Sequence, residues 1–360
     1  MRRLRTGLAG CGKVGQIHAE ALAGLPESEF AAVCDADPAR GAAFAARYGA
    51  RAFSSVSRML SEARLDAVVV ATPHPAHAEA AVAAAERGVH VLVEKPLAAS
   101  LADCDAMIGA ADRSGVRLGV ISQRRLYEPA LRVKKAIEAG KIGKPVLGLV
   151  LMFNWRDAAY YRSDPWRGQW RTEGGGVLVN QAPHQLDLLL WYMGPAGEVS
   201  GYWANLNHPD IEVEDTALAI ARFRNGGLGS VAVSVSQKPG LFTRIHIHGS
   251  NGASVGVETE TGASFIAGVS GAAGPPRNDL WTVPGEEGRL AAFEAEDRAR
   301  FGGLDLTTHY HRLQIQDFLR AAIEDREPMV TGLDGRRVVE FIEAIYRSNR
   351  GRAPVRLPLS

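Results

Sequence analysis

The sequence predicts a two-domain α/β protein, and three observations predict it. The length of 360 residues suits two domains, because one domain usually takes about 100–200 residues. Short apolar runs alternate with Ala-rich helical stretches over the first 120 residues, which is typical of a parallel sheet covered by helices. From residue 199 to about residue 257, apolar and polar side chains alternate, which indicates antiparallel strands. We therefore expect a doubly wound Rossmann domain at residues 1–122 and an α/β domain with a mostly antiparallel sheet at residues 123–360.

The expected elements follow this division along the chain. The strands of the first domain are expected at Arg5–Ala9, Phe30–Cys34, Ala67–Ala71, Val89–Val93 and Val116–Val120. The helices between them are expected at Gly15–Ala23, Pro38–Tyr48, Pro75–Arg87 and Leu101–Ser114. The second domain is expected to hold a helix at Pro129–Ala139, a strand at Pro145–Phe153, an apolar helix ending near Met193, and strands at Thr216–Phe223, Gly229–Ser236 and Arg244–His248. Residues Ala263–Gly288 are rich in Gly and Pro and are expected to form a loop, and helices at His309–Glu324 and Leu333–Ser348 end the chain.

The composition excludes several classes of partner. The 41 basic and 40 acidic side chains are dispersed and give a net charge of +1, so no surface for nucleic acid is expected. The sequence shows neither an apolar run of about 18 residues nor an export signal, so no membrane association is expected. The three cysteines form no C-x-x-C pair, which favours a reducing, cytoplasmic compartment. No metal site is expected, because the pairs His246/His248 and His309/His311 lack a third ligand at a suitable spacing.

A glycine fingerprint, Gly10-x-Gly12-x-x-Gly15, follows the first strand and opens a helix. The first glycine permits a tight turn, the second lets a pyrophosphate approach the backbone, and the third lets the helix pack on the strand. The pyrophosphate is expected on the free amides at the helix start, near Lys13 and Val14. These features predict a dinucleotide site.

Asp35 supports this prediction, because it ends the second strand 20 residues after Gly15. A carboxylate at that position accepts hydrogen bonds from the adenosine ribose hydroxyls. It also repels a 2′-phosphate, so NAD is expected rather than NADP. Arg40 is the one residue that weakens this preference, because its side chain is long enough to reach a phosphate.

The ends of the later strands are expected to border the nicotinamide half of the cofactor, because ligands bind at the carboxyl ends of such strands. Thr72 and Pro73 directly follow the strand expected at Ala67–Ala71, and His77 lies near the start of the next helix. All three are expected among the cofactor-binding residues, with His77 near the helix start. For His18, in the first helix, an approach to the cofactor and simple exposure are equally open.

The triplet Glu94-Lys95-Pro96, which closes the next strand, carries a family resemblance. The chain resembles the glucose–fructose oxidoreductase, inositol dehydrogenase and rhizopine-catabolism family, called Gfo/Idh/MocA. The resemblance rests on the glycine fingerprint, Asp35, the triplet, Gly174-Gly175-Gly176 followed by Asn180, His184 and Asp187, and a closing segment with Gly332, Ser348 and Pro354–Leu357. It spans almost the whole chain and is specific for fold and cofactor type, not for substrate.

The resemblance implies an NAD(P)-dependent oxidoreductase with a Rossmann domain and a larger α/β domain that carries an open, mostly antiparallel sheet. Relatives often form dimers or tetramers through the exposed face of that sheet, so a homodimer or homotetramer is expected. The resemblance also implies a special backbone turn before Pro96, which directs Lys95 into the cleft. Glu94 and Lys95 are counted among the cofactor-binding residues.

Lys95 and His184 are the expected catalytic residues. A lysine beside the nicotinamide holds the reacting hydroxyl, and a histidine, which titrates near neutrality, transfers its proton. Asn180, His184 and Asp187 are spaced to share one face of a helix, and Asn180 and Asp187 are expected to bind substrate. Many relatives carry aspartate at the position of Asn180, and an amide cannot accept a proton at neutral pH.

A segment rich in Trp, Tyr and Arg at Phe153–Thr172 is expected to form a substrate-binding wall. Aromatic faces stack on sugar rings, and arginines bind hydroxyls or anions. The expected substrate-binding residues are Arg156, Tyr160, Trp166 and Arg167 in this segment, together with Arg124. The number of arginines points to an anionic sugar, while an oligomer interface or simple packing is the alternative role.

The sequence therefore predicts an NAD(H)-dependent oxidoreductase that acts on a secondary alcohol of a sugar or cyclitol. Two alternatives remain open at this point. One is an NAD-dependent glycoside hydrolase, which oxidises a ring hydroxyl transiently so that the leaving group can be eliminated. The other is a non-catalytic NAD-binding regulator, which has no need of Lys95 or His184.

Overall fold

The computed structural model describes residues 2–266, 269–271 and 274–359, and it divides the chain into two compact units. Unit 1 comprises Met1–Gln123 and Asp305–Val339, and unit 2 comprises Arg124–Leu304 and Glu340–Ser360. The domains expected at residues 1–122 and 123–360 stay a prediction, and this division groups residues 305–339 with unit 1. Residues 305–339 return to unit 1 because they carry an apolar helix face that packs there.

Unit 1 is built on a six-stranded parallel sheet with the order β3-β2-β1-β4-β5-β6. The strands are β1 (Leu4–Ala9), β2 (Ser28–Cys34), β3 (Arg51–Phe53), β4 (Ala67–Val70), β5 (His90–Val93) and β6 (Leu118–Val120). The helices are α1 (Lys13–Gly24), α2 (Pro38–Tyr48), α3 (Val56–Glu62), α4 (His77–Ala85), α5 (Leu101–Ser114) and α11 (Leu306–Glu324), while α12 (Gly332–Gly351) begins in this unit. The doubly wound Rossmann fold is confirmed, and β3 and α3 are additions to the expected elements.

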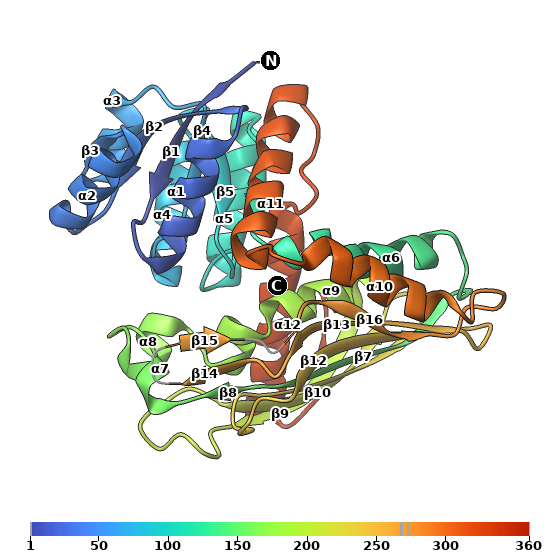
Figure 1. The fold of residues 1–360 in the computed structure, drawn as a ribbon. Coiled ribbons are helices and arrows are strands. Elements are labelled where there is room, and N and C mark those ends of the chain that lie inside the picture. Colours follow the sequence, from blue (N-terminus) through green and yellow to red (C-terminus); the bar gives the residue numbers. More distant parts are fainter. Residues whose placement is uncertain (1, 267–268, 272–273, 360) are drawn as a thin grey trace. The chain divides into compact units, whose positions relative to one another are not determined.

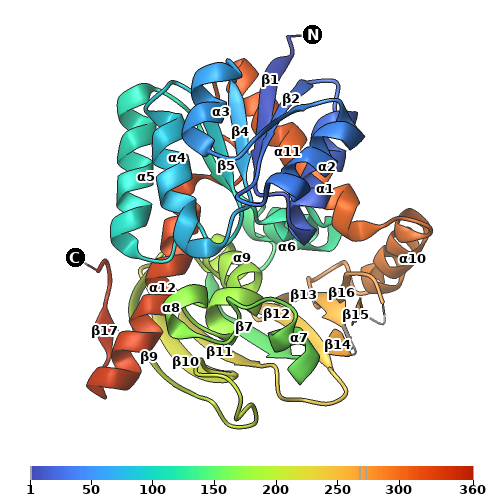
Figure 2. The ribbon, with the colours of Figure 1, turned by 90° about the vertical axis from the view of Figure 1, so that its left-hand side faces the viewer.

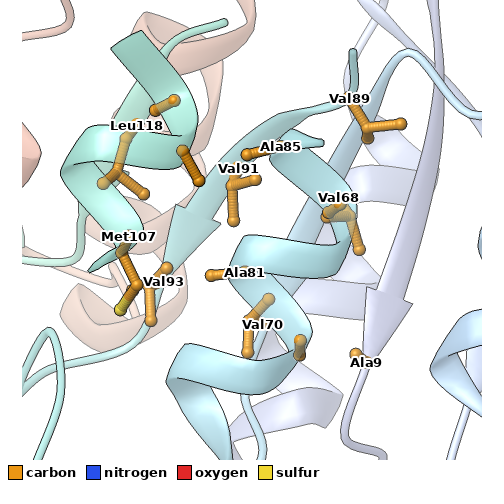
Figure 3. Packing of buried hydrophobic residues seen from close by; sticks show 14 of the residues in the cluster. Ala9, Val68, Val70, Ala81, Ala85, Val89, Val91, Val93, Met107 and Leu118 are labelled. Atoms are coloured by element: carbon orange, nitrogen blue, oxygen red, sulfur yellow. The ribbon is translucent and has the colours of Figure 1, made fainter. Parts of the chain in front are cut away.

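One face of this sheet packs against α4 and α5 (Figure 3). Val68, Val70, Val91 and Val93 are buried there, as is expected for parallel strands covered on both faces. Small side chains on α4, such as the buried Ala81, allow the helix to lie close to the strands. This packing leaves the carboxyl ends of the strands free to carry the loops of the site.

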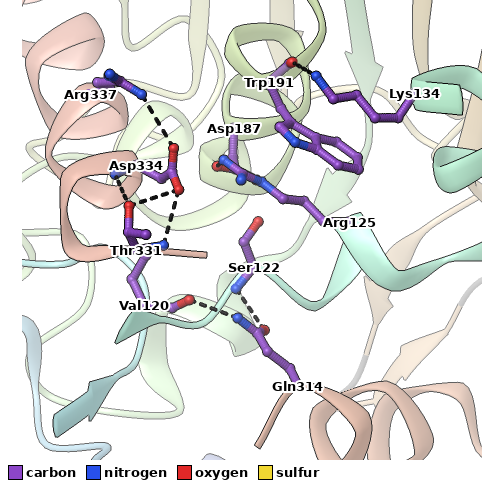
Figure 4. Close-up of polar contacts among 10 residues, drawn as sticks. All are labelled: Val120, Ser122, Arg125, Lys134, Asp187, Trp191, Gln314, Thr331, Asp334 and Arg337. Carbon is purple, nitrogen blue, oxygen red and sulfur yellow. Dashed lines mark hydrogen bonds and ion pairs between the residues drawn. The ribbon is translucent and has the colours of Figure 1, made fainter. Parts of the chain in front are cut away.

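The opposite face is completed by α11, which lies beside α1 and β5 (Figure 1). Ile315, Phe318 and Leu319 of α11 are buried in one cluster with residues of β1 and α1. Gln314 fixes the helix to the end of β6, because its Nε2 donates to the Val120 carbonyl at 2.8 Å and its Oε1 accepts from the Ser122 amide at 2.9 Å (Figure 4). The α11 helix therefore belongs to unit 1, although it lies far from the first 123 residues in the sequence.

Unit 2 contains an eight-stranded sheet with the order β16-β13-β12-β7-β11-β10-β9-β17. Its strands are β7 (Pro145–Phe153), β9 (Ala196–Ala204), β10 (Thr216–Phe223), β11 (Leu228–Ser234), β12 (Phe242–Gly249), β13 (Ser254–Thr261), β16 (Arg277–Trp281) and β17 (Val355–Arg356). Neighbouring strands are antiparallel except for β7 and β11, which are parallel. The expected mostly antiparallel sheet is confirmed.

Helices cover one face of the unit 2 sheet (Figures 1 and 2). They are α6 (Glu128–Glu138), α9 (Pro183–Met193) and α10 (Arg289–Phe301), and the shorter α7 (Ala158–Arg162) and α8 (Trp170–Glu173) precede α9. On the other face of the sheet, apolar side chains of β9, β10 and β11 are exposed, including Tyr202, Leu218 and Ile220. The sheet is therefore open, as the family resemblance implied.

The expected loop at Ala263–Gly288 is wrong in part, because three strands interrupt it. Two short strands, β14 (Ser264–Ile266) and β15 (Val269–Gly271), form a small sheet with β8 (Trp155–Arg156), and β16 joins the large sheet. Residues 267–268 and 272–273 of the expected loop lie outside the described residues. Backbone pairing with β8 and β13 offsets the weak strand preference of this Gly-rich sequence.

A membrane-spanning helix is not found among the described residues, since none of their helices combines sufficient length with sufficient hydropathy.

Candidate functional site

The glycine fingerprint forms a tight loop between β1 and α1. Gly10 has a φ of +101°, and a Cβ atom at this position would lie 2.3 Å from the Ala71 carbonyl oxygen. A Cβ atom at Gly15 would lie 2.2 Å from the Gly10 carbonyl oxygen. Gly12 differs, because no described atom lies within 4 Å of the position that its Cβ would take. The first and third glycines therefore serve chain packing, and the open space over Gly12 fits a pyrophosphate.

Lys13 and Val14 are the first two residues of α1, as expected. The side chain of Val14 is exposed, and Gly12 at the N-cap position supplies no side-chain acceptor. The positive end of the α1 dipole therefore lies at the glycine loop, where it favours an anion such as the expected pyrophosphate.

Asp35 lies directly after β2, and its carboxylate is held by two backbone amides. Its Oδ2 accepts from the Cys11 amide at 2.8 Å, and its Oδ1 accepts from the Asp37 amide at 2.9 Å. Arg40 approaches Asp35 and Asp37 with its guanidinium nitrogens, at 3.8 and 3.5 Å. The carboxylate is thus fixed beside the glycine loop, where it fits the ribose hydroxyls of NAD.

His77 connects two loops at the carboxyl edge of the sheet. The side chain is fully buried, and its Nδ1 lies 3.0 Å from the Pro96 carbonyl oxygen while its Nε2 lies 2.9 Å from the Thr72 carbonyl oxygen. The Lys95–Pro96 peptide bond in the second loop is cis. Both ring nitrogens face backbone carbonyls of the loops that carry Thr72, Pro73 and Lys95, and the expected contact of His77 with the cofactor stays a prediction.

Glu94 lies beneath Lys95 in a buried polar cluster. Its Oε1 lies 2.7 Å from His18 Nε2 and 3.8 Å from His311 Nε2, and its Oε2 accepts from the Lys95 amide at 3.0 Å. Burial raises the pKa of Glu94, but the hydrogen bond from His18 and the charges of His18, His311 and Lys95 outweigh burial and hold the pKa well below its ordinary value. His18 is therefore buried and not exposed, and His311, from α11, is a contributor that sequence reasoning missed.

Gly174-Gly175-Gly176 directly precedes the helical segment of unit 2 that carries Asn180, His184 and Asp187. A Cβ atom at Gly175 would lie 2.2 Å from Tyr346 Oη, and one at Gly176 would lie 1.9 Å from the Glu214 carbonyl oxygen. Glu214 in turn accepts from the amides of Gly176 and Leu178, at 2.8 and 3.0 Å. Only glycine allows this close approach.

The helix that follows is interrupted, contrary to expectation. Residues Val177–Gln181 form one π-helical turn, and α9 starts afresh at Pro183. His184 and Asp187 lie on α9, whereas Asn180 lies in the π turn. The expected single face of Asn180, His184 and Asp187 is therefore wrong, because the π turn changes the angular relation between the residues before and after it.

Asp187 forms a buried, bidentate ion pair with Arg125 (Figure 4). Arg125 donates from Nε to Oδ2 at 2.8 Å and from a terminal nitrogen to Oδ1 at 2.6 Å. Its guanidinium also lies over the Trp191 ring, 5.2 Å from the ring centre. Both carboxylate oxygens of Asp187 are thus bound within unit 2, which gives it a structural contact, while its expected substrate role stays a prediction. His184, one turn earlier, is also buried.

Arg124 is likewise paired within unit 2. One terminal nitrogen donates to Glu260, and the other lies 3.3 Å from Thr259 Oγ1. The side chain is buried, and its pair with Glu260 links the start of unit 2 to β13. The expected substrate contact of Arg124 stays a prediction.

The segment rich in Trp, Tyr and Arg folds into a stack of rings and guanidinium groups. Arg167 lies over the rings of Tyr160 and Trp166, 4.3 and 4.4 Å from their centres, and Arg156 lies 5.5 Å from the centre of Tyr160. Burial raises the pKa of Tyr160 to about 12, so its hydroxyl stays protonated. These four residues are brought together as expected, with Tyr160 buried at their centre.

Tyr160 is tied to the π turn. Its hydroxyl oxygen lies 3.0 Å from Asn180 Nδ2 and 2.8 Å from Gln181 Nε2. Asn180 Nδ2 also donates to Glu173, a buried residue at the end of α8. Sequence reasoning missed Glu173, although its position next to the three glycines was a usable signal.

Among the described residues, no group of three or more His, Cys, Asp or Glu side chains is arranged to hold a metal ion.

Comparisons with known proteins agree with this geometry. Residues 4–122 match the oxidoreductase family with an NAD-binding Rossmann fold, and residues 130–255 match the GFO/IDH/MocA C-terminal domain. The WlbA dehydrogenase from Bordetella pertussis, solved with NADH and UDP-GlcNAcA, is 34% identical, with 100% of each chain covered and a TM-score of 0.84.

Two curated relatives extend the comparison. Myo-inositol 2-dehydrogenase from Thermotoga maritima is 31% identical, with 69% of this chain and 74% of the relative covered. Levoglucosan dehydrogenase from Pseudarthrobacter phenanthrenivorans is 26% identical, with 99% of each chain covered. All three relatives are named as dehydrogenases, so the glycosidase and the non-catalytic regulator are not favoured. The chain belongs to the GFO/IDH/MocA family of NAD-binding oxidoreductases.

Proposed function

We propose that the protein transfers a hydride between NAD(H) and a secondary alcohol carbon of a sugar or cyclitol. The observation that carries the proposal is the common edge of the unit 1 sheet. Gly12, Asp35 and Lys95 each follow the carboxyl end of a strand, and these strands are parallel. A dinucleotide that uses Gly12 and Asp35 therefore extends along the edge that carries Lys95.

The proposed chemistry divides between Lys95 and His184. Bound NAD supplies the hydride acceptor. The Lys95 amine holds the oxygen of the reacting hydroxyl and stabilises the charge that develops on it. His184 accepts the hydroxyl proton during oxidation and returns it during reduction. Asn180 contributes no proton, because an amide does not titrate in this range.

NAD is proposed in preference to NADP. Asp35 has its carboxylate fixed by two amides beside the glycine loop, and a 2′-phosphate would meet this negative charge in a partly dry site. Arg40 is paired with Asp35 and Asp37, so its charge is already partly compensated.

The proposed substrate is an anionic, nucleotide-linked sugar. The relative with 34% identity over the whole chain was solved with UDP-GlcNAcA, which is such a compound. The arginines of the Phe153–Thr172 segment support the same class, because guanidinium groups bind carboxylates and phosphates. Arg156 and Arg167 are the residues proposed to contact it, with the stacked rings of Tyr160 and Trp166 beside the sugar.

We further propose a cytoplasmic homodimer or homotetramer. All three cysteines are unpaired thiols, which fits a reducing compartment. Tyr202, Leu218, Ile220 and Leu228 expose between 49 and 72% of their surface on neighbouring strands of the open sheet. A second copy of the chain that covers this patch would remove its apolar surface from water.

The first experiment is an absorbance assay at the NADH wavelength, with purified protein, NAD and a panel of compounds. UDP-GlcNAcA, myo-inositol and levoglucosan represent the three substrate classes, and glycosides test release of an aglycone. NADH formation with UDP-GlcNAcA above the other compounds supports the proposal. Formation with a neutral compound alone refutes the anionic class, and NAD-dependent aglycone release without NADH accumulation refutes the dehydrogenase.

A further inference from the structure

We propose that Glu173 fixes the side-chain amide of Asn180 so that only its carbonyl oxygen is presented to substrate. Glu173 is then a positioning residue that sets which substrate groups the site accepts. The inference deepens the proposed function and rests on it, because it takes Asn180 to be part of the substrate site.

The amide nitrogen of Asn180 is fully engaged within unit 2. An asparagine amide nitrogen carries two hydrogens. In this protein, Asn180 Nδ2 lies 3.0 Å from Tyr160 Oη and donates also to Glu173 Oε1. Both hydrogens are therefore used inside unit 2. Any further partner of Asn180 must donate a hydrogen to its Oδ1.

Glu173 determines this orientation because it can only accept. Its Oε2 accepts from the Gly168 amide at 2.5 Å, and its Oε1 accepts from Asn180, so both oxygens act as those of an ionised carboxylate. The side chain is buried, with 1% of the residue's surface exposed. A rotated amide would direct Asn180 Oδ1 at this carboxylate, two acceptors would face each other, and no water would screen them.

Tyr160 reinforces the same orientation. Arg167 donates to its hydroxyl oxygen at 2.5 Å and Gln181 donates at 2.8 Å, so the oxygen is held where Asn180 reaches it. The ring is fixed in turn by Arg167 stacked on its face. Three elements, namely α7, α8 and the π turn, thus define the position of one amide group.

The consequence is a choice of substrate chemistry. A hydroxyl or N–H group of a sugar can donate to Asn180 Oδ1, whereas a carboxylate or a ketone oxygen at this position would be repelled. The site therefore presents a neutral acceptor at a position where many relatives carry an aspartate. An aspartate at position 180 would instead stand against the Glu173 carboxylate as a like charge. The Glu173–Asn180 pair keeps an acceptor in place without that repulsion.

The test combines kinetics with a readout that needs no substrate. The variants are Glu173→Gln, Asn180→Asp and the double variant, with Glu212→Gln as the matched control, because Glu212 is an exposed acceptor for the Trp170 amide in the same region. At saturating NAD, we expect Glu173→Gln to raise the KM for UDP-GlcNAcA at least ~10-fold. The Kd for NAD should stay within ~2-fold of the wild-type value, because the variant disturbs only the Asn180 oxygen that accepts from the substrate. We expect kcat/KM to fall further in Asn180→Asp than in Glu173→Gln. The double variant should recover at least ~5-fold in kcat/KM over Asn180→Asp, because a glutamine in place of Glu173 can donate to the new carboxylate.

The second readout is the pair of Asn180 side-chain amide signals in nitrogen-15 NMR spectra of the full-length protein. In the wild type, both hydrogens should exchange slowly with solvent, and the signals should shift in Glu173→Gln. Fast exchange in the wild type, or unchanged KM in Glu173→Gln, overturns the inference. If no sugar in the panel yields NADH, the proposed function fails, while the amide signals still decide the orientation. If Glu173→Gln does not fold, the exchange rates of the Asn180 amide hydrogens in the wild type still decide the orientation of this amide.

Discussion

His208 Nδ1 lies 2.9 Å from the Asp215 carboxylate, and its other ring nitrogen lies 2.8 Å from the Arg156 carbonyl oxygen. Both partners are acceptors, so the imidazole satisfies them together only when both ring nitrogens carry hydrogen. Burial lowers the pKa of His208, but Asp215 and the Arg156 carbonyl outweigh burial and raise the pKa above 6.5. The charged imidazole holds the loop before β10 to β8, where the proposed substrate-binding wall begins.

This ion pair predicts a pH-dependent contribution to stability. Because the pKa of His208 is raised in the folded protein, its protonated ring stabilises the fold fully below pH 6.5. This contribution is lost as the pH rises through the pKa of His208 in the folded state. Burial raises the pKa of Asp215, but hydrogen bonds from His208 and from backbone amides outweigh burial and lower the pKa below 3.8. The contribution of Asp215 is therefore present above pH 3.8 and is lost in stronger acid. Thermal unfolding should show that His208→Gln lowers Tm more at about pH 6 than at about pH 9. An equal loss at both pH values, or an equal pH dependence in the control His309→Gln, would contradict a charged clamp.

Replacement of Asp35 should change cofactor choice. In Asp35→Ala the ribose hydroxyls lose a charged acceptor, an interaction of about 1.5–3 kcal/mol. NAD binding should weaken by about 10- to 100-fold, and the preference over NADP should narrow because the repulsive charge is gone. Titration of intrinsic fluorescence with both cofactors measures this. Glu62→Gln is the control, since it removes a carboxylate that pairs with Arg51 and Arg58 and should leave both affinities and their ratio unchanged.

Lys95→Ala and His184→Ala should each lower kcat by about 100-fold or more, which is a typical loss for acid–base groups. Circular dichroism should report a folded protein in both cases. Lys141→Ala removes an exposed lysine paired with Glu286 and serves as the control for loss of a positive charge. Rates near those of the wild type in either catalytic variant would remove that residue from the mechanism.

Loss of the His77 ring should act on stability and on cofactor binding together. Burial lowers the pKa of His77, so the neutral ring donates to one of the two carbonyls, that of Thr72 or that of Pro96. His77→Ala removes this donor, and an unsatisfied buried group costs about 1–3 kcal/mol. Tm should therefore fall, and NAD should bind more weakly because the two loops at the sheet edge are no longer tied. His77→Gln, which retains a donor, should recover part of both losses. Full NAD affinity in His77→Ala would show that the loops hold their positions without the ring.

The exposed patch on the open sheet predicts a change in assembly. Leu218→Lys combined with Ile220→Lys places two charges at positions that expose 55 and 65% of their surface. Light scattering coupled to size exclusion should find a smaller species than in the wild type, while circular dichroism reports an unchanged fold. Thr216, on the same strand, offers a control through Thr216→Ser. If the wild type is itself a monomer at micromolar concentration, the proposed oligomer is wrong.

The sequence sufficed for those parts of the site whose geometry is local. The glycine loop and Asp35 lie within one strand–helix–strand unit, and local steric constraints explain the glycines of the motif. The periodicity of the valine-rich strands likewise predicted the parallel sheet. These features depend on neighbours in the chain, so a pattern within about 30 residues contains them.

The rest depends on partners that the sequence does not place together. His311 reaches Glu94 only because α11 folds back into unit 1, and Arg125 meets Asp187 across 62 positions. The helix through Asn180 and His184 looked continuous because apolar residues run through it, whereas one π turn shifts its two halves. A periodic pattern fixes which face is apolar, but it does not reveal a single inserted turn.

The division of unit 1 between the two ends of the chain has a consequence for biosynthesis. A ribosome that has made the glycine loop, Asp35 and Lys95 has not yet made α11, whose Ile315, Phe318 and Leu319 cover the apolar cluster of β1 and α1. The cofactor-binding unit is thus begun before unit 2 is made and completed after most of unit 2. Until α11 has emerged, the apolar cluster of β1 and α1 lacks its cover, and exposed apolar surface of this kind favours aggregation of a nascent chain.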